Sequence, residues 1–275
     1  MTPQSDLSPE YVAARTVLLD ALAAVGEAHR ASLVLVGAQA IYLHTGVVDG
    51  TGALMTTDSD LALDADLLAT SPELVATLEG AGFAAGGQPG SWRGNHGITV
   101  DIMSVPHQSG RRPGSRSASL PPHGKQLARI TPGLEPSLVD CAPHRVTALA
   151  ADDGREFSLR VAGPAALLVA KLVKLQERHA DAARGARNRV VSKDAIDCYR
   201  LLKTVSVADL LAGFARHDED SAAGPVSRTA REFLAGDHAQ GEQGVLHSLL
   251  AGQPQLRPID LDAFAALAED LLDAL

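Results

Sequence analysis

Two aspartates placed one residue apart in an apolar segment constrain this chain most. Asp58 and Asp60 stand in the run 57–63, which reads Thr-Asp-Ser-Asp-Leu-Ala-Leu. In a strand, alternate side chains point to the same face, so these two carboxylates stand side by side, about 6 to 7 Å apart along the backbone. Such a pair can share divalent cations. The run therefore predicts a strand that carries part of a metal site.

A third acid has the same setting. Asp101 lies in the apolar, β-branched run 97–103, where a charge is costly unless a partner or a metal compensates it. Three acids on strands of one sheet suggest a metal site formed by Asp58, Asp60 and Asp101. The alternative is that these acids cap neighbouring loops.

Composition limits the class of protein. The chain has 275 residues, of which 45% are apolar, so it can bury a sizeable core and falls between one and two domains by length. The net charge of −9 argues against a uniformly positive surface, yet the basic residues of 107–129 are accompanied by no acid. Two cysteines without metal-binding spacing fit a reducing cytoplasm, and no uncharged stretch reaches membrane-spanning length.

Periodicity and turn residues predict an α+β fold with two parts. Residues 1–162 are expected to form a mixed sheet flanked by helices, and residues 163–275 a helical region. Ser8 and Pro9 predict the start of a helix, as does Pro164. The remaining expectations are strands at 32–36, 57–63, 97–103 and within 145–161, helices at 38–44, 71–80 and 192–204, several short helices over 206–275, and loops at 46–56, 86–96 and 106–136.

Gly37 follows the first predicted strand and precedes a short helix. A glycine there lets the backbone approach a ligand, and the N-terminus of the next helix offers unpaired N–H groups to anions, so a triphosphate would fit this turn. The alternative is an ordinary tight turn.

A basic stripe follows in the second half of the chain. Lys171, Lys174 and Arg178 share one helical face, which either lines an anion site or is a solvated surface. The nearby cluster Arg184, Arg187, Arg189 and Lys193 favours a phosphate-rich ligand.

The single tryptophan and three loop histidines carry less weight. Trp92 either stacks on a base or packs in the core. His96, His107 and His123 lack zinc-site spacing, and we expect them at the surface.

The chain resembles the nucleotidyltransferase superfamily of the polymerase-beta type in three places. These are Gly37 with Ala38, the run from Asp58 to Leu61, and Asp101. The runs 171–178 and 189–197 are similar to motifs of its AbiEii branch, which includes the MenT toxins. The resemblance covers about residues 33 to 203 and leaves the last helices uncovered. The chain departs from the family pattern at Ala38, where glycine or serine is usual, and in the wide loop between Gly37 and Asp58.

The resemblance implies a role for each matching residue. Asp58, Asp60 and Asp101 would bind two Mg²⁺ ions, Lys171 would contact the triphosphate, and Lys193 and Asp194 would form the far wall of the cleft. The implied catalytic residues are Asp58, Asp60, Asp101, Lys171 and Asp194, and the implied nucleotide-binding residues are Gly37, Ala38, Thr57, Lys171, Lys174, Arg178 and Lys193.

The resemblance further implies transfer of a nucleoside monophosphate from an NTP to a hydroxyl acceptor, with release of pyrophosphate. The acceptor implied for a toxin-like member is a tRNA 3′ end, docked on 107–129 and 184–193, and an antitoxin protein would be a partner. A small metabolite, an antibiotic or a protein side chain stays open as acceptor. The competing hypothesis is a catalytically degenerate member that binds a nucleotide or a protein partner without turnover.

Overall fold

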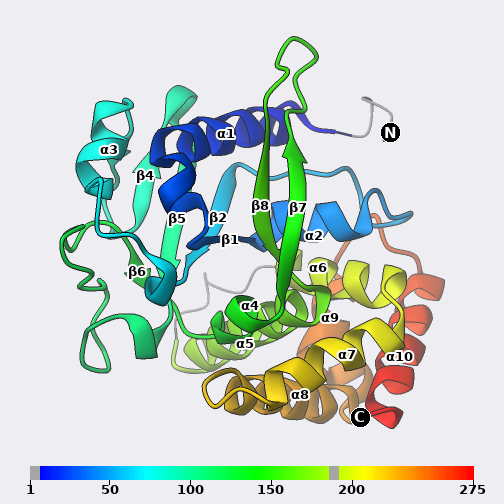
Figure 1. Cartoon of the computed structure of the whole chain (residues 1–275). Coiled ribbons are helices and arrows are strands. Elements are labelled where there is room, and N and C mark those ends of the chain that lie inside the picture. The colour runs from blue at the N-terminus through cyan, green and yellow to red at the C-terminus, as the bar shows by residue number, and fades with distance from the viewer. Residues whose placement is uncertain (1–6, 186–191) are drawn as a thin grey trace.

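The computed structural model describes residues 7–185 and 192–275, and it places one mixed sheet above a group of helices (Figure 1). The first part contains α1 (Pro9–Arg30), β1 (Leu33–Val36), α2 (Gly37–Thr45), β2 (Asp58–Leu63), α3 (Leu74–Gly80), β3 (Ala84–Ala85), β4 (Ser91–Arg93), β5 (Thr99–Ser104), β6 (Arg129–Ile130), α4 (Glu135–Val139), β7 (Cys141–Thr147) and β8 (Glu156–Ala162). The second part contains α5 (Pro164–Ala183), α6 (Ser192–Thr204), α7 (Val207–Asp218), α8 (Ala223–His238), α9 (Val245–Ala251) and α10 (Pro258–Asp273).

The sheet mixes parallel and antiparallel pairs. Its strand order is β3-β4-β5-β2-β1-β8-β7, with β6 paired to β5. β1 runs antiparallel to β2 and parallel to β8, and β2 runs parallel to β5. Helix α1 lies across the sheet, and the β7–β8 hairpin projects beyond it (Figure 1). The α+β fold with a C-terminal helical region is therefore confirmed.

Several predicted elements agree closely with the structure, and the three short strands β3, β4 and β6 were missed. Ser8 caps α1 by accepting from the Tyr11 backbone N–H, as expected. The segment predicted as loop 86–96 instead contains β4, and the long loop after Pro106 contains β6. Trp92 of β4 is fully buried and donates from Nε1 to the Leu127 carbonyl at 3.1 Å, so the packing interpretation of this residue is correct.

The prediction for one histidine was wrong. His123 is 1% exposed, because its ring accepts the Leu74 backbone N–H at Nδ1 and contacts the Ala69 carbonyl through Nε2. Both ring nitrogens are thus used within the protein, and His123 anchors the start of α3 rather than facing solvent.

A buried polar chain holds the acidic strand β2 in place. Gln39 of α2 accepts from Arg15 Nε of α1 at 2.7 Å and donates to Ser59 Oγ at 2.5 Å. All three side chains are buried, although Ser59 lies between the two aspartates of β2. Since buried polar groups are costly unless paired, this chain fixes the strand against both helices.

Gln39→Ala should lower the free energy of unfolding by about 2 to 3 kcal/mol, because the buried Arg15 guanidinium loses an acceptor. Urea unfolding measures the change. Gln240→Ala is the control, since Gln240 is exposed just after α8 and its side-chain amide donates to the Gly236 carbonyl of that helix, and we expect a change within about 0.5 kcal/mol. Equal losses in the two variants would contradict this role of Gln39.

Asp140 joins the sheet to the helical part. Its buried carboxylate accepts from the Ala166 backbone N–H at 3.2 Å and from Arg216 Nη2 at 2.6 Å, and it lies 3.3 Å from His217 Nε2. Burial acts to raise the pKa of Asp140, but the hydrogen bonds from His217 and Arg216 outweigh it and lower the pKa below its ordinary value.

Asp140→Asn should cost about 1.5 to 3 kcal/mol of unfolding free energy at neutral pH, because charge-assisted hydrogen bonds are lost. The folded-state pKa lies below the unfolded value of about 3.9, so the carboxylate stabilises the fold above that value and loses this contribution as the pH falls through the folded-state pKa. Unfolding titrations at neutral and acid pH should therefore show the difference from wild type shrinking in acid. Asp218→Asn, at a more exposed ion pair, should cost at most about 1 kcal/mol. A difference for Asp140→Asn that does not change with pH would contradict the assignment.

Candidate functional site

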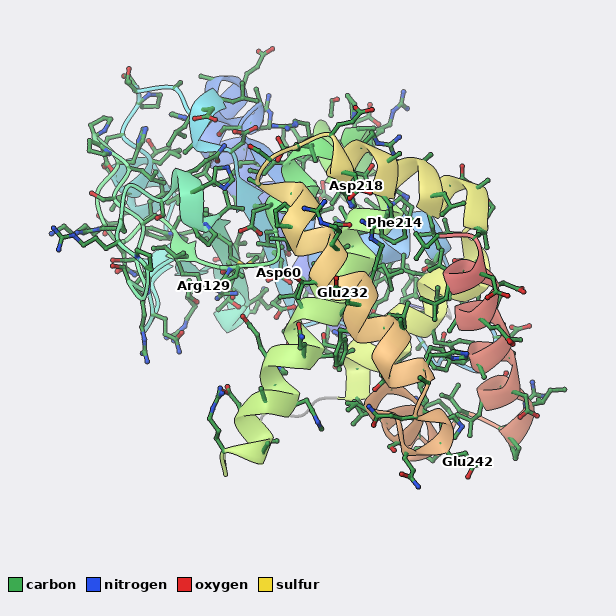
Figure 2. All side chains as sticks on the ribbon, turned by 90° about the horizontal axis from the view of Figure 1, so that it is seen from below. Asp60, Arg129, Phe214, Asp218, Glu232 and Glu242 are labelled. Carbon is green, nitrogen blue, oxygen red and sulfur yellow. The ribbon has the colours of Figure 1, made fainter. Side chains whose placement is uncertain are left out.

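A pocket of about 400 Å³ opens between the end of the sheet and helix α5. The sheet side contributes Gly37, Asp60 and Arg129, and α5 contributes Lys171, Lys174, Glu177, Arg178 and Asp181. Figure 2 shows Asp60 and Arg129 close together near this helix. One acid of the sheet side, Asp60, thus faces a helical wall that carries three cations and two acids.

The three predicted aspartates share one face of the sheet. Asp58 and Asp60 are two residues apart on β2, and Asp101 is the register partner of Asp60 on the parallel strand β5. Register partners on adjacent strands point to the same face, so the three carboxylates are neighbours. Asp60 lines the pocket and is partly exposed, and its carboxylate has no hydrogen bond or ion pair among the residues that the structure describes.

Gly37 is required by its contact with Asp60. Its φ of +68° is the left-handed conformation that favours glycine, and a Cβ atom there would overlap the Asp60 carboxylate. Gly37 also begins α2, whose N-cap residue Val36 provides no side-chain cap. The first turn of α2 therefore keeps backbone N–H groups beside the pocket, as the triphosphate hypothesis requires.

Burial and nearby negative charge both act on the pKa of Asp60. Burial, followed by the neighbouring charges of Asp58 and Asp101, raises the pKa of Asp60 to about 6, against an opposing effect of Lys174. A divalent cation bound by these acids would relieve that repulsion.

Asp101 already has a cationic partner. Arg129 Nη1 lies 2.6 Å from Asp101 Oδ2, while Asp101 Oδ1 is buried with no hydrogen-bond partner in the described part of the chain. Carboxylates suit Mg²⁺, and the unpaired Oδ1 offers it a ligand. However, within residues 7–185 and 192–275 no group of three or more His, Cys, Asp or Glu side chains could hold a metal ion as it stands. One oxygen of the third acid is bound to Arg129 instead.

The basic stripe of α5 has two different environments along its length. Lys171 is 7% exposed and lies 3.0 Å from Asp194 Oδ1 and 2.7 Å from Asp197 Oδ2, both on α6. Burial alone would lower the pKa of Lys171, but Asp197 and Asp194 together raise it. Asp194 also pairs with Arg178, and Lys174 lies 3.7 Å from it. The solvated interpretation of the stripe is thus wrong for Lys171, and Lys174 and Arg178 are the cations with the more exposed side chains.

The other predicted residues lie further from the pocket. Ala38 is buried, Thr57 is exposed, Lys193 is half-buried, and none of these three lines the pocket. Asp58 is half-buried and accepts from Thr56 Oγ1 at 2.7 Å. Arg184 is exposed directly after the end of α5, whereas Arg187 and Arg189 fall outside the described residues.

Two residues of the site were missed by sequence reasoning. Asp197 follows Asp194 by three positions, so the two acids share a helical face that matches Lys171 and Lys174, and this spacing was a readable signal. Arg129 stands in a loop-like run, and its pairing with β5 gives it a place in the site that no local pattern indicated.

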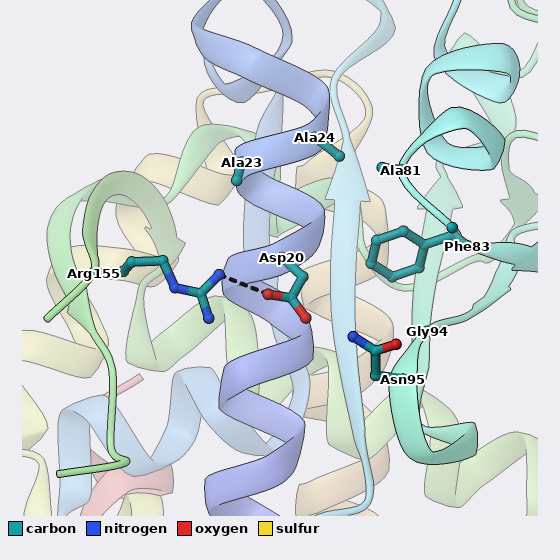
Figure 3. A pocket seen from close by; sticks show the side chains of 9 residues that line it. Asp20, Ala23, Ala24, Ala81, Phe83, Gly94, Asn95 and Arg155 are labelled. Atoms are coloured by element: carbon teal, nitrogen blue, oxygen red, sulfur yellow. Dashed lines mark hydrogen bonds and ion pairs between the residues drawn. The ribbon is translucent and has the colours of Figure 1, made fainter. Parts of the chain in front are cut away.

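A second pocket, of about 360 Å³, lies between α1 and the α3–β4 region (Figure 3). Its acid Asp20 is bound to Arg155 at 2.6 Å, so the charges there compensate each other. The pocket beside Asp60 carries the uncompensated acid and is the stronger candidate for chemistry.

In comparisons with known proteins, no protein family, curated protein or solved structure matches the chain. The candidate site therefore rests on the residues and their geometry.

Among the described residues, none of the helices is both long and apolar enough to span a membrane.

Lys171→Met should lower the free energy of unfolding by about 3 to 5 kcal/mol, because buried Asp194 and Asp197 lose the cation between them. Lys174→Met, on the same helix with its side chain half exposed, should cost about 1 kcal/mol or less. Thermal or urea unfolding compares the two variants. Equal costs would show that the buried cluster around Lys171 does not support the pocket wall.

Proposed function

We propose that this chain is a metal-dependent nucleotidyltransferase, which transfers a nucleoside monophosphate from an NTP to a hydroxyl acceptor. The observation that carries the proposal is the sheet face shared by Asp58, Asp60 and Asp101, of which Asp60 lines a pocket whose opposite wall presents Lys174 and Arg178. This combination gives cation ligands and phosphate-binding groups on opposite sides of a single space.

Each group would have a distinct part in the reaction. Lys174, Arg178 and the first turn of α2 would bind the triphosphate, and Gly37 would let the chain approach it closely. Asp58, Asp60 and Oδ1 of Asp101 would hold Mg²⁺, which would offset negative charge on the phosphate oxygens. The acceptor oxygen forms a bond to the α-phosphorus, the bond to the β-phosphate oxygen breaks, and pyrophosphate leaves while the hydroxyl proton passes to solvent.

An RNA end is the acceptor that the surface supports best. Arg111, Arg112, Arg116 and Lys125 are exposed on the loop that leads into β6, and Arg129 at its end lines the pocket. A polyanion docked on this loop would place its terminus near Asp60. A tRNA 3′ end fits this arrangement, and an antitoxin-type protein would be the expected regulatory partner. The free thiols of Cys141 and Cys198 support a cytoplasmic location.

A second candidate is a degenerate member that binds nucleotide without turnover. The ion pair between Arg129 and Asp101 favours it, because one ligand oxygen of the third acid is already occupied. Turnover and binding therefore have to be measured separately.

Incubating the protein with Mg²⁺, each labelled NTP and total tRNA should give label transfer that Asp60→Asn reduces by about 10²-fold or more, the scale seen when one preorganised active-site group is removed. Asp66→Asn is the control, since Asp66 is an exposed acid just beyond the same strand. Transfer by wild type and the control, but not by Asp60→Asn or Asp58→Asn, supports the enzyme. Nucleotide binding without transfer to tRNA, small hydroxyl compounds or protein would support the degenerate member.

A further inference from the structure

Arg129 forms an ion pair with Asp101, one of the three acids on the shared sheet face. Its guanidinium donates from Nη1 to Asp101 Oδ2 at 2.6 Å and lies 3.2 Å from Met103 Sδ through Nη2. Both of these residues are on β5, one strand away from Asp60. A fixed positive charge is therefore built into the edge of the acidic cluster.

The backbone fixes this position from both sides. Arg129 is the register partner of Met103 in the β5–β6 pair, and the next residue, Ile130, donates to the Arg116 carbonyl at 2.8 Å. On the other side Gly90, with φ of +78°, lies so close that a Cβ atom would meet the Arg129 backbone nitrogen at 2.5 Å. The backbone of β6 is thus held tightly at Arg129. The guanidinium therefore reaches Asp101 from a fixed backbone position.

The two carboxylate oxygens of Asp101 have different environments. Asp101 Oδ2 is used by Arg129, whereas Oδ1 is buried without a hydrogen-bond partner among the described residues. Within the same residues the Asp60 carboxylate has no ion pair, and the Asp58 carboxylate accepts only from Thr56 Oγ1. Among the described residues, the carboxylate of Asp60 and Oδ1 of Asp101 thus remain without a partner, while Oδ2 of Asp101 is bound to Arg129.

We propose that the guanidinium of Arg129 takes the place of one metal ion, so that the site binds a single divalent cation. The proposal rests on the proposed function and changes its expected two-ion site to a one-ion site. Two effects act together: the hydrogen bond occupies a ligand oxygen, and the fixed positive charge repels a further cation. Arg129 is a positioning and charge-compensating residue in this scheme, and it would hold Oδ1 of Asp101 toward the remaining ion.

Titration with Mn²⁺ alone, following free Mn²⁺ by electron paramagnetic resonance, counts the ions directly. We count as specific only the ions that wild type binds and the double variant Asp58→Asn/Asp60→Asn does not. Weak Mn²⁺ binding elsewhere on this acidic protein occurs in both proteins and is therefore subtracted. We expect one specific ion in wild type and two in Arg129→Gln. Arg129→Lys keeps the charge and should stay at one. Arg116→Gln, an exposed arginine in the same loop, is the matched control and should also stay at one.

The outcomes separate the inference from the function on which it rests. Two specific ions in wild type, or one in a folded Arg129→Gln protein, would overturn the role of Arg129 and leave the nucleotidyltransferase proposal intact. Two ions in Arg129→Lys would also overturn it, because charge would then not exclude the second ion. No specific ion in wild type would remove the cation site itself, and both proposals with it. A thermal unfolding curve for each variant confirms that the titrated protein is folded.

Discussion

Repulsion among three carboxylates on one sheet face is the constraint around which the candidate site is built. Asp58, Asp60 and Asp101 are fixed side by side by strand register, so their charges cannot separate without breaking the sheet. Burial, followed by the charges of Asp58 and Asp101, raises the pKa of Asp60 to about 6. Such a cluster persists in a folded protein when surrounding structure determines it, and strain of this kind is frequent at functional sites.

Cationic side chains compensate the acids at two distances. Arg129 pairs directly with Asp101, and Lys174 faces Asp60 across the pocket. Behind them, Lys171 is enclosed by Asp194 and Asp197, which hold the stripe of α5 against α6. The sheet wall thus has more acids than cations, while the cations of the helix wall are partly paired with aspartates of α6. A ligand that brings both a divalent cation and phosphates would satisfy the two walls together.

Local sequence patterns predicted much of this fold and only part of the site. The strand at β1, the turn at Gly37 and the alternation in β2 are carried by adjacent residues, so they can be read directly. The short strands β4 and β6 depend on pairing with β5, and their glycine- and serine-rich surroundings hide them. The same reason explains Arg129: its role comes from a register that joins distant segments. His123 was misjudged because its partners are backbone groups of another segment, which spacing rules for zinc do not detect.

The central claim is that the acids of β2 and β5 bind a cation, and anomalous scattering from crystals soaked in Mn²⁺ tests it most directly. We expect one anomalous peak within coordinating distance of the Asp58 and Asp60 carboxylates, on the side of Oδ1 of Asp101. A map with no peak at these carboxylates, or with Mn²⁺ only elsewhere on the protein surface, would contradict the account.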